Sequence, residues 1–244
     1  AMAEGEKLRG LAGLLSAPAN AKPVGRPAPR PPRELQPLSL SVTEVQTLYI
    51  GSNDGMLHAF NASDGAELFT YVPNLLDMAT LKNLSAKENF VHRYFVDGPI
   101  VVSNRRQTPG KNYLVGALGR GGKGIYGLDV STPSTFSSTG KAWEYNGGGD
   151  SADVADMGLV ISKPLIAKLN TGETAAIVAN GVNSANEHAV LFIVNLETGE
   201  RIKKIDTYRT SVTTDGVDNG LSAPTGVGAH GNGTVVYVLA GGLL

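Results

Sequence analysis

A repeated arrangement of short strands and tight turns is the feature that most constrains the fold of this chain. The first copy, residues 48–72, reads as two strands and the start of a third, separated by polar turns at 53–55 and 63–65. Asp54-Gly55 is a strong hairpin signal, because both residue types tolerate the positive φ angles that a type I′ turn requires. A meander of this size cannot bury its own faces. It must therefore pack against other parts of the chain.

The same order of parts recurs along the sequence. Strand-like stretches follow at 113–116 and 125–129, then at 176–178 and 191–195, and residues 235–239 open a fourth copy. Equivalent glycines recur with a spacing of about 65 residues, at Gly51, Gly116, Gly181 and Gly241. The first meander therefore has copies of itself to pack against.

Each later copy is preceded by a short apolar stretch headed by proline, at Pro99, Pro164 or Pro224. Proline cannot donate to a sheet ladder, so it belongs on an edge strand or at a strand's first residue. In a radial array of sheets, the innermost strand supplies such an edge. Four short strands per unit at a fixed period predict an all-β fold, a modified β-propeller built from four-stranded antiparallel meanders. About three and a half blades are expected, near residues 47–72, 97–145, 162–206 and 222–244.

Two segments differ from this repeat. Residues 1–46 contain the proline-rich run 18–37, which favours polyproline II and reads as a long solvated loop of the first blade, with a docking segment for an SH3-like partner as the alternative. A short helix is expected at 4–15. Residues 74–92 predict one inter-blade helix with Asn74 as its N-cap. Its apolar stripe consists of Leu75, Leu76, Met78, Leu81 and Leu84.

Composition excludes several classes of protein. The net charge is −1, from 21 basic and 22 acidic residues, which argues against non-specific nucleic-acid binding. The absence of cysteine excludes disulfides and thiolate chemistry. No apolar run approaches the roughly 20 residues of a membrane span. The first residues lack a signal-peptide core, so if the native protein is exported, we expect that this chain has lost its leader or begins inside a longer protein.

The motifs that could carry chemistry are few. Residues 119–124 match a GxGxxG pattern, but a strand follows instead of a helix, which indicates a flexible hairpin and not a dinucleotide site. Asp150, Asp153 and Asp156 could ligate a hard cation. Because Ca²⁺ usually needs six or more oxygens, a solvated acidic loop is the preferred reading. We expect Trp143 to close its blade as a packing anchor.

Histidines and nucleophiles form no recognisable catalytic or metal-binding pattern. The four histidines show no metal-ligand spacing; they are His58, His92, His188 and His230. His58 lies in a strand and is most simply a packed side chain. There is no GxSxG elbow, and a Cys–His pair is impossible. We therefore predict a protein that is not an enzyme and that uses no cofactor.

Four long segments carry a resemblance to a known family: residues 48–65, 91–103, 117–131 and 179–202. In order and spacing they resemble the C-terminal domain of the PilY1/PilC family of type IV pilus biogenesis factors and tip-associated adhesins. The resemblance implies a seven-bladed propeller, of which about half would be present. It also implies promotion of pilus assembly or opposition to retraction. The implied partners are pilins, minor pilins and a host-cell surface, and the implied location is the outer membrane or pilus tip of a Gram-negative bacterium.

The same resemblance implies a calcium loop, which the family often carries. By position it falls at Gly228, His230, Asn232 and Val236, and none of these residues is acidic. Asn232 could offer one side-chain oxygen, but charge count sets affinity for Ca²⁺. We therefore predict a degenerate site, which calcium binding that is lost on mutation of Asn232 would contradict.

A periplasmic quinoprotein-like or BamB-like propeller is the alternative, either a pyrroloquinoline-quinone dehydrogenase or an assembly scaffold. Its blade pattern fits Asp54-Gly55 and Asp64-Gly65 loosely, but Phe69 and Tyr145 stand near positions where that fold usually has docking tryptophans. A chromophore that appears on adding the cofactor with Ca²⁺ would identify it.

Loops on propeller faces present the contacts for partners. The candidate loops are 74–92, 119–124, 146–156 and 206–219. A propeller cut after three and a half blades leaves open sheet edges, which predicts poor solubility or oligomerisation.

Overall fold

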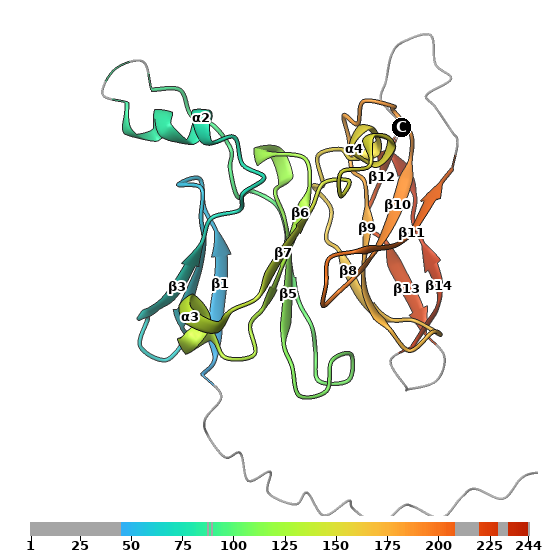
Figure 1. Cartoon of the computed structure of the whole chain (residues 1–244), viewed down its shortest axis with the longest axis horizontal. Coiled ribbons are helices and arrows are strands. Elements are labelled where there is room, and N and C mark those ends of the chain that lie inside the picture. The colour runs from blue at the N-terminus through green and yellow to red at the C-terminus, as the bar shows by residue number, and fades with distance from the viewer. Residues whose placement is uncertain (1–44, 87, 89, 208–219, 229–233, 244) are drawn as a thin grey trace, which may run out of the picture. The chain divides into compact units, whose positions relative to one another are not determined.

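The computed structural model describes residues 45–86, 88, 90–207, 220–228 and 234–243 (Figure 1). The first seven strands are β1 (Thr47–Gly51), β2 (Leu57–Asn61), β3 (Glu67–Tyr71), β4 (Ile100–Val102), β5 (Tyr113–Ala117), β6 (Ile125–Asp129) and β7 (Ala142–Tyr145). The others are β8 (Leu165–Lys168), β9 (Thr174–Ala179), β10 (Val190–Asn195), β11 (Arg201–Asp206), β12 (Gly220–Leu221), β13 (Thr225–Gly228), β14 (Val235–Leu239) and β15 (Gly242–Leu243). The helices are α2 (Met78–Lys82), η1 (Asn83–Ser85), η2 (Gly119–Gly121), η3 (Pro133–Thr135), α3 (Phe136–Thr139) and α4 (Ser151–Asp156). The predictions for 4–15 and 18–37 lie outside the described residues.

The larger sheets are antiparallel meanders whose spatial order follows the sequence. β1–β2–β3 form the first sheet, β4–β5–β6–β7 the second, and β8–β9–β10–β11 the third. β13 pairs with β14, and β12 pairs with β15. The strands that follow Pro99 and Pro164, β4 and β8, lie on sheet edges, where a residue without an N–H is tolerated. The predicted all-β fold of four-stranded antiparallel meanders is confirmed.

Successive sheets pack face to face through side chains that alternate along each strand. In β5, Leu114 enters a core that also contains Leu57 and Phe69 of the first sheet. Its neighbour Val115 enters a second core with Phe192 of the third sheet. β8 contacts both β4 and β13, so the first strands of successive sheets lie side by side. This stacking is that of a partial propeller, with no closed ring of sheets in the described residues.

The connection between β1 and β2 differs from the predicted turn. Gly55 has φ +92°, whereas Asp54 is not among the residues with positive φ, so a two-residue type I′ turn is wrong. The loop is longer, and the N–H of Ser52 donates to the carbonyl of Met56 at 3.0 Å. The carboxylate of Asp54 accepts the N–H of Met56 at 3.0 Å, which stabilises the wider turn.

The helices also differ from the prediction. The helical part of 74–92 is confined to α2 and η1, and Asp77 is the N-cap of α2 because its carboxylate accepts the N–H of Ala79. Asn74 instead donates its N–H to Glu144 of the second sheet at 2.7 Å. The expectation of one helix is wrong, because α3 and α4 also form, and α4 lies where a loop was predicted. No helix in the described part of the chain is both long and apolar enough to span a membrane.

Trp143 joins two sheets instead of closing only its own. Its indole Nε1–H donates to the carbonyl of Leu196, beyond β10 of the third sheet, at 2.9 Å. Its ring lies on Gly199, where φ is +77° and an added Cβ would stand 2.7 Å from the ring. Glycine at 199 therefore permits the close approach of the second and third sheets.

Candidate partner-binding surface

The candidate loops meet in two groups. The loop between β5 and β6 touches the segment that follows α2, where the N–H of Asp97 donates to the carbonyl of Leu118 at 3.3 Å. Helix α4 touches the connection between β9 and β10, where Asn186 donates its N–H to the carbonyl of Ala155 at 3.1 Å. The sequence ranges 74–92 and 119–124 thus come together, and 146–156 meets the β9–β10 connection and the end of β11 (Figure 1). Residues 208–219 lie outside the described residues.

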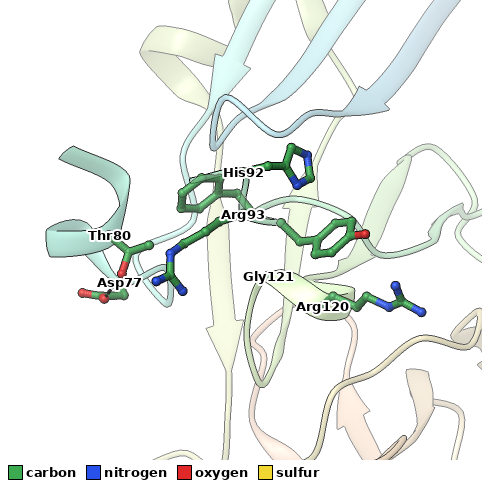
Figure 2. Close-up of a pocket in the computed structure, with 8 residues that line it drawn as sticks. Asp77, Thr80, His92, Arg93, Arg120 and Gly121 are labelled. Atoms are coloured by element: carbon green, nitrogen blue, oxygen red, sulfur yellow. Dashed lines mark hydrogen bonds between the residues drawn. The ribbon is translucent and has the colours of Figure 1, made fainter. Parts of the chain in front are cut away.

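The first group encloses a pocket of about 320 Å³. Two loops and the start of α2 supply its lining, which Figure 2 shows. The residues are Asp77, Thr80, His92, Arg93, Tyr94, Phe95, Arg120 and Gly121. Arg93 and Tyr94 lie just beyond the range proposed from sequence. Aromatic and basic side chains are interleaved in residues 90–94, and this pattern could have extended the predicted loop 74–92 to include Arg93 and Tyr94.

The turn of the first sheet holds this segment in place. The side chain of Asn53 accepts the N–H of Phe95 at 3.2 Å, and its amide nitrogen lies 3.3 Å from Nε2 of His92. Gly121 packs directly on this backbone, because a Cβ there would stand 1.6 Å from the carbonyl oxygen of Phe95. The two loops are therefore fixed against each other by backbone contacts, and their side chains are free to project outward.

The charged side chains of the pocket point in different directions (Figure 2). Arg93 extends toward Asp77 and Thr80. Hydrogen bonds from the Thr80 side chain and the Ala79 N–H, assisted by the Arg93 charge, lower the pKa of the Asp77 carboxyl. Arg120 lies on the other side, with its guanidinium carbon 5.4 Å from the centre of the Tyr94 ring in a cation–π contact. Within the described residues, neither guanidinium forms an ion pair with a carboxylate.

We call Phe90, Val91, Arg93, Tyr94 and Arg120 the aromatic–basic surface. Phe90 is 58% exposed and Val91 66% exposed, and Tyr94 is also exposed. Large apolar side chains beside unpaired cations suit an extended contact with another protein. Because the charges diverge, the arrangement suits a small ligand poorly.

The three aspartates form a folded cluster, so the prediction of a solvated acidic loop is wrong. Asp150 caps α4, whereas Asp153 is 1% exposed and Asp156 is 2% exposed. Lys204 of β11 lies 2.9 Å from Asp153 and 2.8 Å from Asp156, and Arg201 also pairs with Asp153. Because Asp153 and Asp156 are three residues apart in a short helix, they lie on the same side of it and face these cations.

The histidines occupy separate environments. His58 is bonded to Asp54 and Glu67, and its hydrogen bond to Glu67, opposed by burial and supported by Asp54, raises its pKa. It also stacks on Phe60. His92 lines the pocket, and His188 lies beside Asp206. His230 lies outside the described residues.

The implied calcium loop falls at the end of β13, which closes with Gly228, and residues 229–233 lie outside the described part. The residue types at 228, 230, 232 and 236 provide no carboxylate. This donor set does not fit Ca²⁺, whose sites in proteins are built from oxygen ligands that usually include carboxylates.

Stacked antiparallel meanders of this kind define a β-propeller protein. The family profile described as "PilY1 beta-propeller domain" matches residues 38–244. The chain belongs to the PilY1 β-propeller domain family.

Curated relatives and a solved structure agree with this assignment. A "Type IV pilus biogenesis factor PilY1 homolog" of Xylella fastidiosa is 40% identical over 199 residues, or 80% of this chain. The "Type IV pilus biogenesis factor PilY1" of Pseudomonas aeruginosa is 36% identical over 80% of the chain. The chain spans only 12% and 16% of these two relatives. The crystal structure of the P. aeruginosa PilY1 C-terminal domain superposes with a TM-score of 0.62 at 33% identity, covering 82% of this chain and 37% of that one.

Proposed function

We propose that this chain is a non-enzymatic binding region of a type IV pilus biogenesis factor, and that it contacts pilins or minor pilins through the aromatic–basic surface. The names of the relatives support a role in pilus biogenesis. The exposure of Phe90, Val91 and Tyr94, close in the chain to Arg93, carries the choice of surface. Arg120 lies over Tyr94, and neither arginine forms an ion pair among the described residues. Aromatic residues and arginine are enriched among residues that dominate binding energy.

Through this contact the protein promotes pilus assembly or opposes retraction. It acts after export, at the outer membrane or the pilus tip, where the same loops would face a host-cell surface. We assign the role to residues 47–244, with 1–46 as a proline-rich segment that belongs to the first blade or precedes it. The residues mapped to the calcium loop support a protein that works without calcium at that position.

Surface piliation of the native strain tests the role. Pili are counted with and without this region, in the presence and in the absence of the retraction motor. Pili that vanish on deletion and return when the motor is also removed indicate opposition to retraction. Pili that stay absent indicate a role in assembly, and unchanged piliation in both backgrounds contradicts the proposal.

Point variants in the full-length native protein test the surface. Combining Tyr94→Ala with Arg120→Gln should weaken capture of the pilus subunits about tenfold or more, since hot-spot side chains contribute more than about 1 kcal/mol each. Arg106→Gln is the matched control, because Arg106 is exposed in the turn between β4 and β5, at the opposite end of β5. Equal binding by both variants would place the contact elsewhere.

A further inference from the structure

Three side chains from three elements converge beside α4. Asp156 ends that helix, His188 lies in the connection between β9 and β10, and Asp206 ends β11. One ligand atom from each lies within 4.8 Å of the others. We propose that Asp156, His188 and Asp206 form a binding site for one divalent transition-metal ion of the Zn²⁺ type. The proposal is independent of the pilus function.

The distances between the ligand atoms suit a tetrahedral ion. Zn²⁺ bonds to nitrogen and oxygen of about 2.0–2.2 Å place neighbouring ligand atoms roughly 3.3–3.5 Å apart. Nδ1 of His188 is 3.0 Å from Oδ2 of Asp206 and 3.9 Å from Oδ1 of Asp156. These two distances bracket the required separation. The oxygens of Asp156 and Asp206 lie within 4.8 Å of each other, so side-chain shifts of up to roughly 1.4 Å would complete the site.

The protein already orients the buried ligand. Oδ2 of Asp156 is held by Lys204 at 2.8 Å, and Oδ1 accepts the side-chain N–H of Asn186 at 2.8 Å. Partners of this kind fix a carboxylate and sustain metal affinity. The side chains of His188 and Asp206 are partly exposed, at 25% and 12%, so the ion can reach the site from solvent.

The ligand types select the metal. One imidazole nitrogen with two carboxylates suits Zn²⁺ and similar ions. Ca²⁺ takes six to eight oxygens, so this set should bind it weakly. The site is therefore distinct in place and in chemistry from the calcium loop expected near residues 228–236. A bound ion would connect α4, the β9–β10 connection and β11.

Calorimetric titration of the full chain with ZnCl₂ tests the site. We expect one Zn²⁺ per chain, binding at least about tenfold weaker in His188→Gln, because even partners outside the ligand shell contribute 10–100-fold. CaCl₂ should not compete. Cobalt substitution adds a second measurement, since its visible absorption should appear with wild type and be lost with the variant.

A second histidine supplies the control. His58 also contacts two carboxylates, but Asp54 lies 2.8 Å from Nε2 and Glu67 lies 2.7 Å from Nδ1, on opposite sides of the ring. No single ion can reach all three groups, so His58→Gln should bind Zn²⁺ as wild type does. Asp206→Asn replaces His188→Gln if that variant does not fold. Failure of wild type to bind Zn²⁺, or equal binding by the site variants, would overturn the proposal.

Discussion

At the residue scale, Lys204 is the partner of two carboxylates that have almost no contact with solvent. Removing one member of a buried ion pair leaves an uncompensated charge, which costs about 3–5 kcal/mol. Lys204→Met should lower the free energy of unfolding by an amount in that range, measured by urea denaturation. Lys203 is exposed on the other face of β11, so Lys203→Met should change stability by less than about 0.5 kcal/mol. Equal effects would mean that the buried pairing contributes nothing.

The same cluster of Asp153, Asp156 and Lys204 predicts that the free energy of unfolding depends on pH. Burial raises the pKa of the Asp153 carboxyl, but hydrogen bonds from Tyr145 and Lys204 outweigh burial and lower it from 3.8. A carboxyl with a lowered pKa stabilises the folded state above pH 3.8, and that contribution is lost as the pH falls toward the lowered value. The pKa of Lys204 is raised above 10.5, since its bonds to Asp156 and Asp153 outweigh burial, so its contribution is lost only in strong alkali.

Asp153→Asn isolates this titration. The difference in unfolding free energy between wild type and Asp153→Asn should be largest near neutral pH and should shrink when urea denaturation is repeated near pH 3. A difference that stayed constant over this range would show that Asp153 keeps its ordinary pKa in the folded protein.

At the element scale, Trp143 connects β7 to the turn after β10. Trp143→Phe removes the hydrogen bond to the Leu196 carbonyl, which is worth about 1 kcal/mol, and part of the contact with Gly199. We expect a loss of about 1–2 kcal/mol in the free energy of unfolding. Unfolding is followed by circular dichroism, because the chain has one tryptophan and the variant therefore has no tryptophan fluorescence. Tyr237→Phe alters an exposed aromatic residue and should leave the unfolding midpoint unchanged. Identical midpoints for both variants would contradict the role of Trp143 between the sheets.

The strands could be predicted from sequence because their signals are local. Short runs of apolar and β-branched residues next to glycine-containing turns mark β1, β5, β6, β9 and β10. The helices depended on distant residues. Asn74 caps no helix; its backbone N–H and its side-chain amide both donate to Glu144, on another sheet. Leu75 and Leu76 pack into the core ahead of α2 instead of forming a helical stripe.

The candidate surface could be predicted only in part, for the same reason. The sequence indicated the two loops, but not that Arg120 would lie over Tyr94, because that contact joins two loops that are distant in the sequence. The aspartates of α4 also seemed solvated in the sequence, where nothing near them shows that Lys204 and Arg201 would lie opposite. Local sequence patterns therefore predicted the strands and loops. The contacts between residues distant in the sequence became visible only in the structure.

At the scale of the whole molecule, one face of the first sheet is exposed. Leu48 is 58% exposed and Ile50 52% exposed on β1, whereas every residue of β5 in the second sheet is buried. β1 is the edge strand of this sheet, and an apolar stripe on an edge strand favours association between copies. We predict concentration-dependent self-association of this chain, which Ile50→Lys should reduce in sedimentation velocity experiments.

Val91→Lys is the control for this prediction. It adds the same charge at an exposed apolar position outside the strands of the first sheet, so it should leave self-association unchanged. A chain that stays monomeric at all concentrations would contradict the prediction. So would an equal response to both substitutions.

The division of hydrogen bonds among the sheets has a mechanical consequence. Strand ladders run within each of the first three sheets, while side-chain packing, single hydrogen bonds and ion pairs join one sheet to the next. A force applied along the chain would therefore separate neighbouring sheets before it broke the ladders. Each sheet would then open from its outer strand, one strand at a time. Such a molecule lengthens under load in discrete steps, and each step dissipates work while the remaining sheets stay folded.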